Sequence, residues 1–321
     1  MRILPPLLFA VLVSAGLLSL AGRLPAGESE LPRVNPPIPL LWKVSDADNT
    51  VYLLGSFHLL KPDDYPLSAD IDRAFRASES LVFEVPPGEL ADPATGQRFV
   101  AAAGYANGGS LSQTLPQATL DKLQALVTAG GGSMAQLEPF EPWFVNLSLV
   151  LGVSHGLGFS GELGLDRHLM EQAAKAGKST SGLETIEVQL RMLDASPMDE
   201  QVAALSEFVE RPQEVPLKLA ELHQAWRSGD VPQLDRLGRL DMRDKTPETY
   251  RLMNVVRNQA WLPKIRALLD AGAQDTLVVV GALHLLGEDG LVQHMQAAGY
   301  DVERVCSACA VQATPAAATA R

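Results

Sequence analysis

Cysteine is nearly absent from this chain: the 321 residues include only Cys306 and Cys309, in the segment VCSACAVQ. A CxxC pair can serve as a redox centre, as half of a metal site or as a short disulfide. The lack of a second CxxC excludes a four-cysteine zinc site. For a protein that is exported, as argued below, we interpret the pair as a local disulfide without a catalytic role.

Positive charge is also scarce, with 26 Lys and Arg against 38 Asp and Glu and a formal net charge of -12. The sequence has no long basic run. An acidic surface repels phosphate backbones, so we do not expect nucleic acid as a partner. HExxH and HxxEH are absent too, which excludes the usual helix-borne signatures of zinc proteases.

Long apolar runs are missing except at the N-terminus. Arg2 is the only charge before ILPPLLFAVLVSAGLLSLAG, and Ser19-Leu20-Ala21 fits a small-x-small cleavage site. We therefore predict a signal peptide over residues 1–21 and an exported protein, periplasmic or secreted. No stable membrane span is expected after cleavage. An uncleaved anchor is the alternative, although two prolines interrupt a run that barely reaches bilayer length.

What the chain does contain is enough apolar material for a large core, since 46% of its residues are hydrophobic. Residues 22–38 are rich in proline and polar residues and indicate a linker. We predict a single domain over residues 39–305, followed by a loose tail over residues 306–321.

Strand patterns occur at both ends of this domain. Segments 39–44 and 51–57 flank a turn-rich stretch and predict a hairpin. A helical pattern over 67–77 and an apolar strand pattern over 81–85 follow. At the other end, residues 276–280 form a valine-rich run, with a helix predicted over 290–298 and a strand over 301–305.

The middle, about residues 97–270, has mainly helical periodicity, with helices expected over 164–177, 190–209, 217–227 and 249–269. The simplest architecture is an α/β fold. Its central β-sheet is formed by the N- and C-terminal segments, with a largely helical insertion between them.

Two similar segments lie near the ends of the domain: LLGSFHLL at residues 53–60 and VVGALHLL at residues 279–286. In both, a Gly-x-x-His follows an apolar strand, and the carboxyl edge of an α/β sheet is where ligands bind. If the two strands are neighbours, His58 and His284 face one crevice and could bind a metal as neutral imidazoles. A third Gly-x-x-His ends at His155 but lacks the two leucines.

Glu84, in the otherwise apolar segment LVFEVP, is a candidate third ligand because a carboxylate there needs a partner. Two His and one carboxylate suit zinc, manganese, cobalt or iron, and such a divalent metal lowers the pKa of its bound water. The simpler alternatives are that the strand-end His side chains are only hydrogen-bonded and that Glu84 points to water.

The order of motifs resembles the TraB/PrgY/GumN family, closest to its bacterial GumN-like branch. The motifs are GSFH, FEV, GLDRHL with AGK and LET, RNQAW, and VGALHLLGEDGL with a final GY, over about residues 40–305. The animal Tiki proteins, described as metal-dependent proteases acting on Wnt, are relatives in this family. The resemblance implies an α/β fold with both terminal GxxH motifs in the active site.

The resemblance also implies roles for individual residues. It gives His58, Glu84 and His284 metal-binding or catalytic roles. It further points to four residues: Arg257 for a substrate carboxylate or an oxyanion, Asn258 for orienting substrate or a ligand, and Asp166 and Glu184 as partners of the ligands. Asp166 could alternatively only cap the following helix. We therefore expect a metal-dependent hydrolase of the peptidase type, with a peptide or protein as substrate.

Three other functions stay open. Gly152-Val153-Ser154-His155-Gly156 matches the G-x-S-x-G of serine hydrolases, but residues 143–151 indicate a helix and the segment after it is glycine-rich. Two His and a Glu could instead hold a metal or haem without turnover. The third possibility is an interaction protein that uses its acidic helical insertion.

Overall fold

The computed structural model describes residues 35–270, 272 and 274–312. The predicted signal peptide, and the predicted linker as far as residue 34, lie outside the described residues. Among the residues that the structure does describe, no helix has the length and apolar character of a membrane span.

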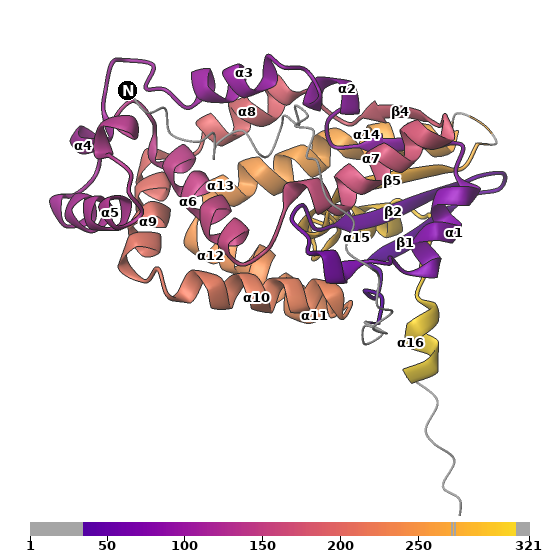
Figure 1. The fold of residues 1–321 in the computed structure, drawn as a ribbon. Helices are drawn as coiled ribbons and strands as arrows, with labels where there is room; N and C mark the ends of the chain where they lie inside the picture. Colours follow the sequence, from indigo (N-terminus) through magenta and orange to yellow (C-terminus); the bar gives the residue numbers. More distant parts are fainter. Residues whose placement is uncertain (1–34, 271, 273, 313–321) are drawn as a thin grey trace, which may run out of the picture.

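Six strands form one mixed sheet in the order β4-β3-β5-β2-β1-β6. Strands β2, β5, β3 and β4 are parallel, and β1 runs antiparallel to both β2 and β6. Five of the six strands come from the two ends of the domain, as predicted, with helices between them (Figure 1). The strands are β1 (Leu41–Ser45), β2 (Thr50–Ser56), β3 (Ser80–Phe83), β4 (Ser179–Gly182), β5 (Thr276–Gly281) and β6 (Asp301–Arg304).

Strand β5 is buried along its whole length, which suits the apolar run TLVVVG at the centre of a sheet covered on both faces. It lies between β2 and β3, so the predicted strand-helix-strand unit 51–85 is parallel but its strands are not adjacent. The strands that precede the two Gly-x-x-His motifs are direct neighbours, with Ser56 opposite Gly281.

Helices α1 (Ala69–Ala77) and α7 (Leu165–Ala176) cover one face of the sheet, and α14 (Arg257–Asp270) and α15 (Leu291–Ala297) cover the other (Figure 1). The chain moves outward from β2 to β3 and β4 and then returns to β5. Right-handed crossovers in opposite directions place their helices on opposite faces. Both faces of the central strands β2, β5 and β3 are therefore largely buried.

The helical insertion has a second apolar core, made by Leu111, Leu123, Val145, Leu205 and Phe208. Pro197 divides the predicted helix 190–209 into α8 and α9. The remaining helices are α2 (Pro87–Leu90), α3 (Thr95–Ala102), α4 (Leu111–Thr114), α5 (Gln117–Ala129), α6 (Pro142–Gly156), α8 (Ile186–Asp194), α9 (Met198–Glu210), α10 (Glu214–Arg227), α11 (Val231–Leu234), α12 (Asp241–Lys245), α13 (Pro247–Tyr250) and α16 (Ser307–Gln312).

Short 3-10 and π-helical segments connect these elements. The predicted helix 249–269 is composed of α13, the π-helical η5 and α14. The segments are η1 (Pro62–Asp64), η2 (Met134–Gln136), η3 (Gly161–Leu163), η4 (Asp235–Leu240, π-helical), η5 (Arg251–Val256) and η6 (Ala282–Leu285).

Two features differ from the sequence-based expectation. Strand β4, of sequence STSG, comes from the middle of the chain and was not predicted because it is polar and mostly exposed. Residues 307–312, within the predicted tail, form helix α16. The predicted local disulfide between Cys306 and Cys309 is present.

Candidate functional site

Each of the four parallel strands delivers one candidate side chain at its carboxyl end. His58 follows β2, Glu84 directly follows β3, Glu184 follows β4, and His284 lies in η6 after β5. Glu84 is thus one residue beyond its strand rather than within it. Because parallel strands share a carboxyl edge, these residues meet although 226 positions separate the first from the last.

His284 is a neutral imidazole whose Nε2 is an acceptor. Its Nδ1 lies 2.8 Å from Oδ1 of Asn258. The Asn258 amide nitrogen donates to Oδ1 of Asn254 and to the carbonyl oxygens of His284 and Asp289, so Oδ1 is left to accept the Nδ1 proton. Burial, reinforced by the Arg257 charge, lowers the pKa of His284 to about 3.

His58 is held from the opposite side of the site. Its Nδ1 lies 2.8 Å from Oδ2 of Asp166, and Oδ1 of Asp166 accepts from the Ser56 hydroxyl at 2.7 Å. The charge of the Asp166 carboxylate and its hydrogen bond raise the pKa of His58 to about 9. A metal ion at Nε2 would therefore displace a proton.

The N-terminus of α7 brings Asp166 to His58. A Cβ at Gly164 would lie only 2.2 Å from the His58 carbonyl oxygen, so no larger residue allows this approach. The amide of Leu165 donates to the carbonyl of Phe57. The His58 side chain is 60% exposed, whereas those of Glu84 and His284 are 11% and 9% exposed, so solvent reaches the site from the His58 side.

The Glu84 carboxylate accepts on both oxygens. Oε1 takes the Gly281 amide at 2.7 Å, and Oε2 takes Arg257 at 2.6 Å and Gln189 at 3.2 Å. Burial raises the pKa of Glu84, but Arg257, His284 and His58 outweigh it and hold the pKa well below its usual range. Glu84 is therefore an ionised carboxylate that is largely shielded from solvent and accepts hydrogen bonds.

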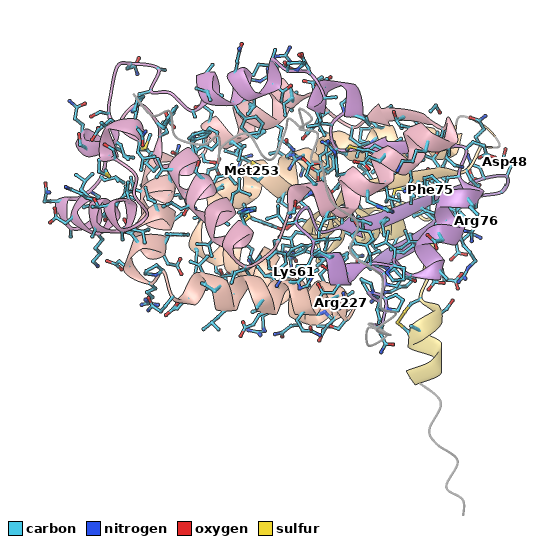
Figure 2. All side chains as sticks on the ribbon, in the orientation of Figure 1. Asp48, Lys61, Phe75, Arg76, Arg227 and Met253 are labelled. Atoms are coloured by element: carbon cyan, nitrogen blue, oxygen red, sulfur yellow. A yellow bond between two sulfur atoms is a disulfide. The ribbon has the colours of Figure 1, made fainter. Side chains whose placement is uncertain are left out.

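Arg257 is the central cation of the site, and its side chain is only 4% exposed. Its Nε donates to Glu184 at 2.9 Å, and Nη2 donates to Glu184 and to Glu84 at 2.6 Å each. Nη1 donates to the carbonyl of Met253 and to Nε2 of His284 at 3.1 Å each. Met253, in η5 of the helical insertion, is labelled in Figure 2. All five N–H groups of the guanidinium are engaged.

Glu184 completes this network. Its Oε2 accepts the indole N–H of Trp261 at 3.0 Å, and the Trp261 ring lies 4.6 Å from the guanidinium carbon of Arg257. Burial raises the pKa of Glu184 in spite of Arg257. Since both oxygens only accept hydrogen bonds, the geometry is that of a carboxylate.

The three predicted ligands converge on Gly281. A Cβ there would lie 3.1 Å from Nε2 of His58, 3.2 Å from Oε1 of Glu84 and 3.6 Å from Cδ2 of His284. Nε2 of His284 is 3.9 Å from Oε1 of Glu84. The donors suit a divalent cation in kind, because each imidazole has its Nδ1 bound to a polar partner and Nε2 as the remaining ring nitrogen.

The donors are not drawn together to coordination distance. Across the described ranges, no group of three His, Cys, Asp or Glu side chains stands in the arrangement of a metal site. Arg257 contacts two of the three donors itself.

A family model for the TraB/PrgY/gumN family matches residues 40–304, nearly the whole predicted domain. The chain belongs to the TraB/PrgY/gumN family. Neither the curated proteins nor the solved structures include one that matches this chain. The matched residues contain both Gly-x-x-His motifs and all seven candidate site residues.

The sequence predicts all seven residues, and the structure places them in two hydrogen-bonded groups: His58 with Asp166, and Arg257 with Glu84, Glu184, His284 and Asn258. Both groups reach Gly281. The sequence analysis does not identify Ser56, Gln189 or Trp261, which contact Asp166, Glu84 and Glu184 respectively. Ser56 lies inside the quoted GSFH and Trp261 inside RNQAW, so their position in the motifs was an available signal. Gln189 has no comparable signal.

The serine-hydrolase alternative does not fit this geometry. Ser154 lies within α6, near its end, and its hydroxyl donates to the carbonyl of Val150 at 2.8 Å. A nucleophile of that class sits on a sharp turn between a strand and a helix. The prediction of a helix over 143–151 is confirmed.

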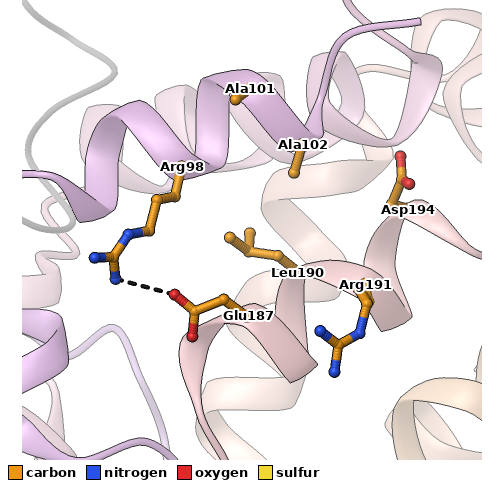
Figure 3. A pocket seen from close by; sticks show the side chains of 7 residues that line it. All are labelled: Arg98, Ala101, Ala102, Glu187, Leu190, Arg191 and Asp194. Atoms are coloured by element: carbon orange, nitrogen blue, oxygen red, sulfur yellow. Dashed lines mark ion pairs between the residues drawn. The ribbon is translucent and has the colours of Figure 1, made fainter. Parts of the chain in front are cut away.

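A separate cavity of about 330 Å³ lies between α3 and α8 (Figure 3). An ion pair of 3.1 Å joins Arg98 and Glu187 across it. None of the predicted ligands lines this cavity. The lining residues are Arg98, Ala101, Ala102, Glu187, Leu190, Arg191 and Asp194.

Proposed function

We propose that this protein is an exported metal-dependent hydrolase that cleaves a peptide bond, with His58, Glu84 and His284 as the metal ligands. The observation that carries the proposal is the convergence of Nε2 of His58, Oε1 of Glu84 and the His284 ring over Gly281. A divalent cation such as zinc, manganese, cobalt or iron would polarise a carbonyl oxygen and acidify water at that position.

The chain's own residues prepare this position. Asp166 and Asn258 bind Nδ1 of His58 and His284, which fixes both rings and their tautomers. Arg257 places a permanent positive charge beside Glu84 and His284, which favours negative charge developing on a substrate. In this structure, its N–H groups are all engaged by the protein.

Metal binding without turnover is the second candidate. The observation that favours it is the same saturation of Arg257, which leaves the guanidinium no N–H group for an oxyanion. Export remains a part of the proposal that rests on the sequence of residues 1–21 alone.

The test uses protein purified without a histidine tag. We expect one equivalent of a divalent metal by elemental analysis, and metal-dependent cleavage of a mixture of unstructured peptides, read by mass spectrometry. His58→Ala and His284→Ala should lose both. The matched control is His155→Ala, which removes the histidine of the third Gly-x-x-His motif and should change neither.

The outcomes separate the two candidates. Cleavage retained in both His58→Ala and His284→Ala would rule out the metalloenzyme. Stoichiometric metal that is lost in these variants, without cleavage of any peptide by the wild type, would establish the binding protein. Ser154→Ala should leave cleavage intact.

A further inference from the structure

Arg257 makes two sets of contacts, one with predicted metal ligands and one with other groups. One set joins Arg257 to groups that are not predicted ligands: two N–H groups to Glu184, one to the Met253 carbonyl, and the stacked ring of Trp261. The other set consists of one N–H to Oε2 of Glu84 and one to Nε2 of His284. The first set anchors the guanidinium, and the second uses the donor atoms that a metal needs.

The charges of the site are unbalanced without a metal. Glu84, Glu184 and Asp166 act as three carboxylates, since their side-chain oxygens accept hydrogen bonds from the protein. Arg257 brings a single positive charge to two of these carboxylates, so carboxylates are in excess, and a divalent cation would offset that excess.

We propose that Arg257 is a resident cation of this site, which holds Glu84 and His284 when no metal is bound. His284, through Nε2, and Glu84 would then be the groups that hold a divalent metal, while Arg257 would keep its contacts with Glu184, Met253 and Trp261. The proposal rests on the proposed metal site. It adds that Arg257 orders the ligands of the metal-free site and, by the same contacts, lowers the affinity for a metal.

Two physical arguments support this role. Without Arg257, two carboxylates with 11% and 5% exposed side chains would face each other unpaired, which is strongly unfavourable. With Arg257, an incoming metal meets a like charge that directly contacts two of its three donors, which weakens its binding. The same side chain therefore stabilises the metal-free protein and opposes the metal.

The experiment compares wild type with Arg257→Met, which keeps an unbranched apolar stem and removes the charge. Thermal unfolding of the metal-free proteins and calorimetric titration with Co²⁺ are measured on the full mature chain. We expect the melting temperature of metal-free Arg257→Met to fall by roughly 6–12 °C. We expect its Kd for Co²⁺ to be at least about tenfold lower than that of wild type.

Arg304→Met is the matched control. Arg304 lies on β6, at the far side of the sheet, where it donates to the carbonyls of Pro39 and Gly229 and lies over Trp42. This variant loses the same side chain without touching a predicted ligand. Its Kd for Co²⁺ should stay within about twofold of wild type, whatever its stability.

Arg257→Lys covers the case in which Arg257→Met does not fold. The lysine ammonium has three N–H donors, which are too few for the two carboxylates, the Met253 carbonyl and His284 together. We expect the positive charge to stay and the contact with His284 to be lost. Co²⁺ should then bind more tightly than to wild type, by a smaller factor than in Arg257→Met.

The two proposals fail in different ways. If wild type binds Co²⁺ and the Arg257 variants bind it equally or more weakly, the resident-cation role is wrong and the metal site stands. If neither wild type nor any Arg257 variant binds Co²⁺, both are wrong. Tighter binding by the variants supports both.

Discussion

Two buried ion clusters in this protein are built from the same residue types in opposite proportions. At the candidate site, Arg257 serves two carboxylates, Glu84 and Glu184, and also an imidazole acceptor. Beside η1, the single carboxylate of Asp64 receives Arg227, Nε2 of His223 at 2.9 Å from both of its oxygens, and the amide of Lys61. Lys61 and Arg227, the last residue of α10, are labelled in Figure 2.

The difference lies in which kind of group is in excess. The Asp64 cluster has more donors than acceptors, so it has no place for a further cation and joins α10 to the loop after β2. The candidate site has more acceptors than donors, so a cation from solution improves its balance. Buried charge alone therefore does not indicate a site, whereas an excess of acceptors around one arginine does.

The largest expected difference between the clusters is in metal binding. Glu84→Gln should weaken Co²⁺ binding by more than the roughly 100-fold that changes outside the ligand shell cause, because it removes a ligand charge. Asp64→Asn should leave the Kd within about twofold of wild type. Isothermal titration measures both, and a loss of binding in Asp64→Asn would break the comparison.

The Asp64 cluster should instead contribute to the free energy of unfolding. Asp64 is fully buried, and Asp64→Asn leaves Arg227 and His223 without their counter-charge, so the free energy of unfolding should fall by about 3 kcal/mol. Asp63→Asn, at the exposed neighbouring position, should change it by less than about 0.5 kcal/mol. Urea unfolding followed by circular dichroism measures both variants, and equal losses would contradict a structural role specific to Asp64.

A smaller effect is expected at Asp166, which touches no predicted metal position but binds His58. Asp166→Asn keeps the shape of the side chain and removes its charge, so Co²⁺ affinity should fall by about tenfold. The titration used for Glu84→Gln measures it. An unchanged Kd would mean that the Ser56–Asp166–His58 chain does not orient a ligand.

The smallest effect is a pH dependence that belongs to the Asp64 cluster. Burial raises the pKa of Asp64, but hydrogen bonds from His223, the Lys61 amide and Arg227 outweigh it and leave the pKa below its usual value. A depressed pKa adds stability above the unfolded-state pKa of about 4, and this stability is lost as the pH falls further. The difference in unfolding free energy between wild type and Asp64→Asn should therefore shrink as the pH falls below about 4. A difference that widens below pH 4 would contradict the assignment.

Much of the fold follows from local patterns. The valine-rich run 276–280 and the apolar segment 51–57 predict buried strands, and both are central in the sheet. The polar strand β4 has no such pattern, because it lies at the sheet edge and gains its order from pairing with β3. The position of β5 between β2 and β3 is likewise a property of the whole sheet that no local pattern contains.

The candidate site was predictable where a residue's position in the fold determines its neighbours. His58 and His284 follow adjacent parallel strands, so their meeting follows from the topology once the strands pair. The contact of Arg257 with Glu84 depends on the rotation of α14 against the sheet, and that of Gln189 on the placement of α8. Helix rotation and placement are set by side-chain packing, which a single sequence does not reveal.

The central position of β5 also determines when the sheet can be completed during synthesis. Strands β2 and β3 each have an unpaired edge until residue 276 has been synthesised, because the strand that joins them comes about two hundred positions later. A nascent chain that stops short of this point has no continuous sheet and no site, and it exposes two strand edges to other chains. The sheet of such a chain therefore stays incomplete until most of the chain has been made.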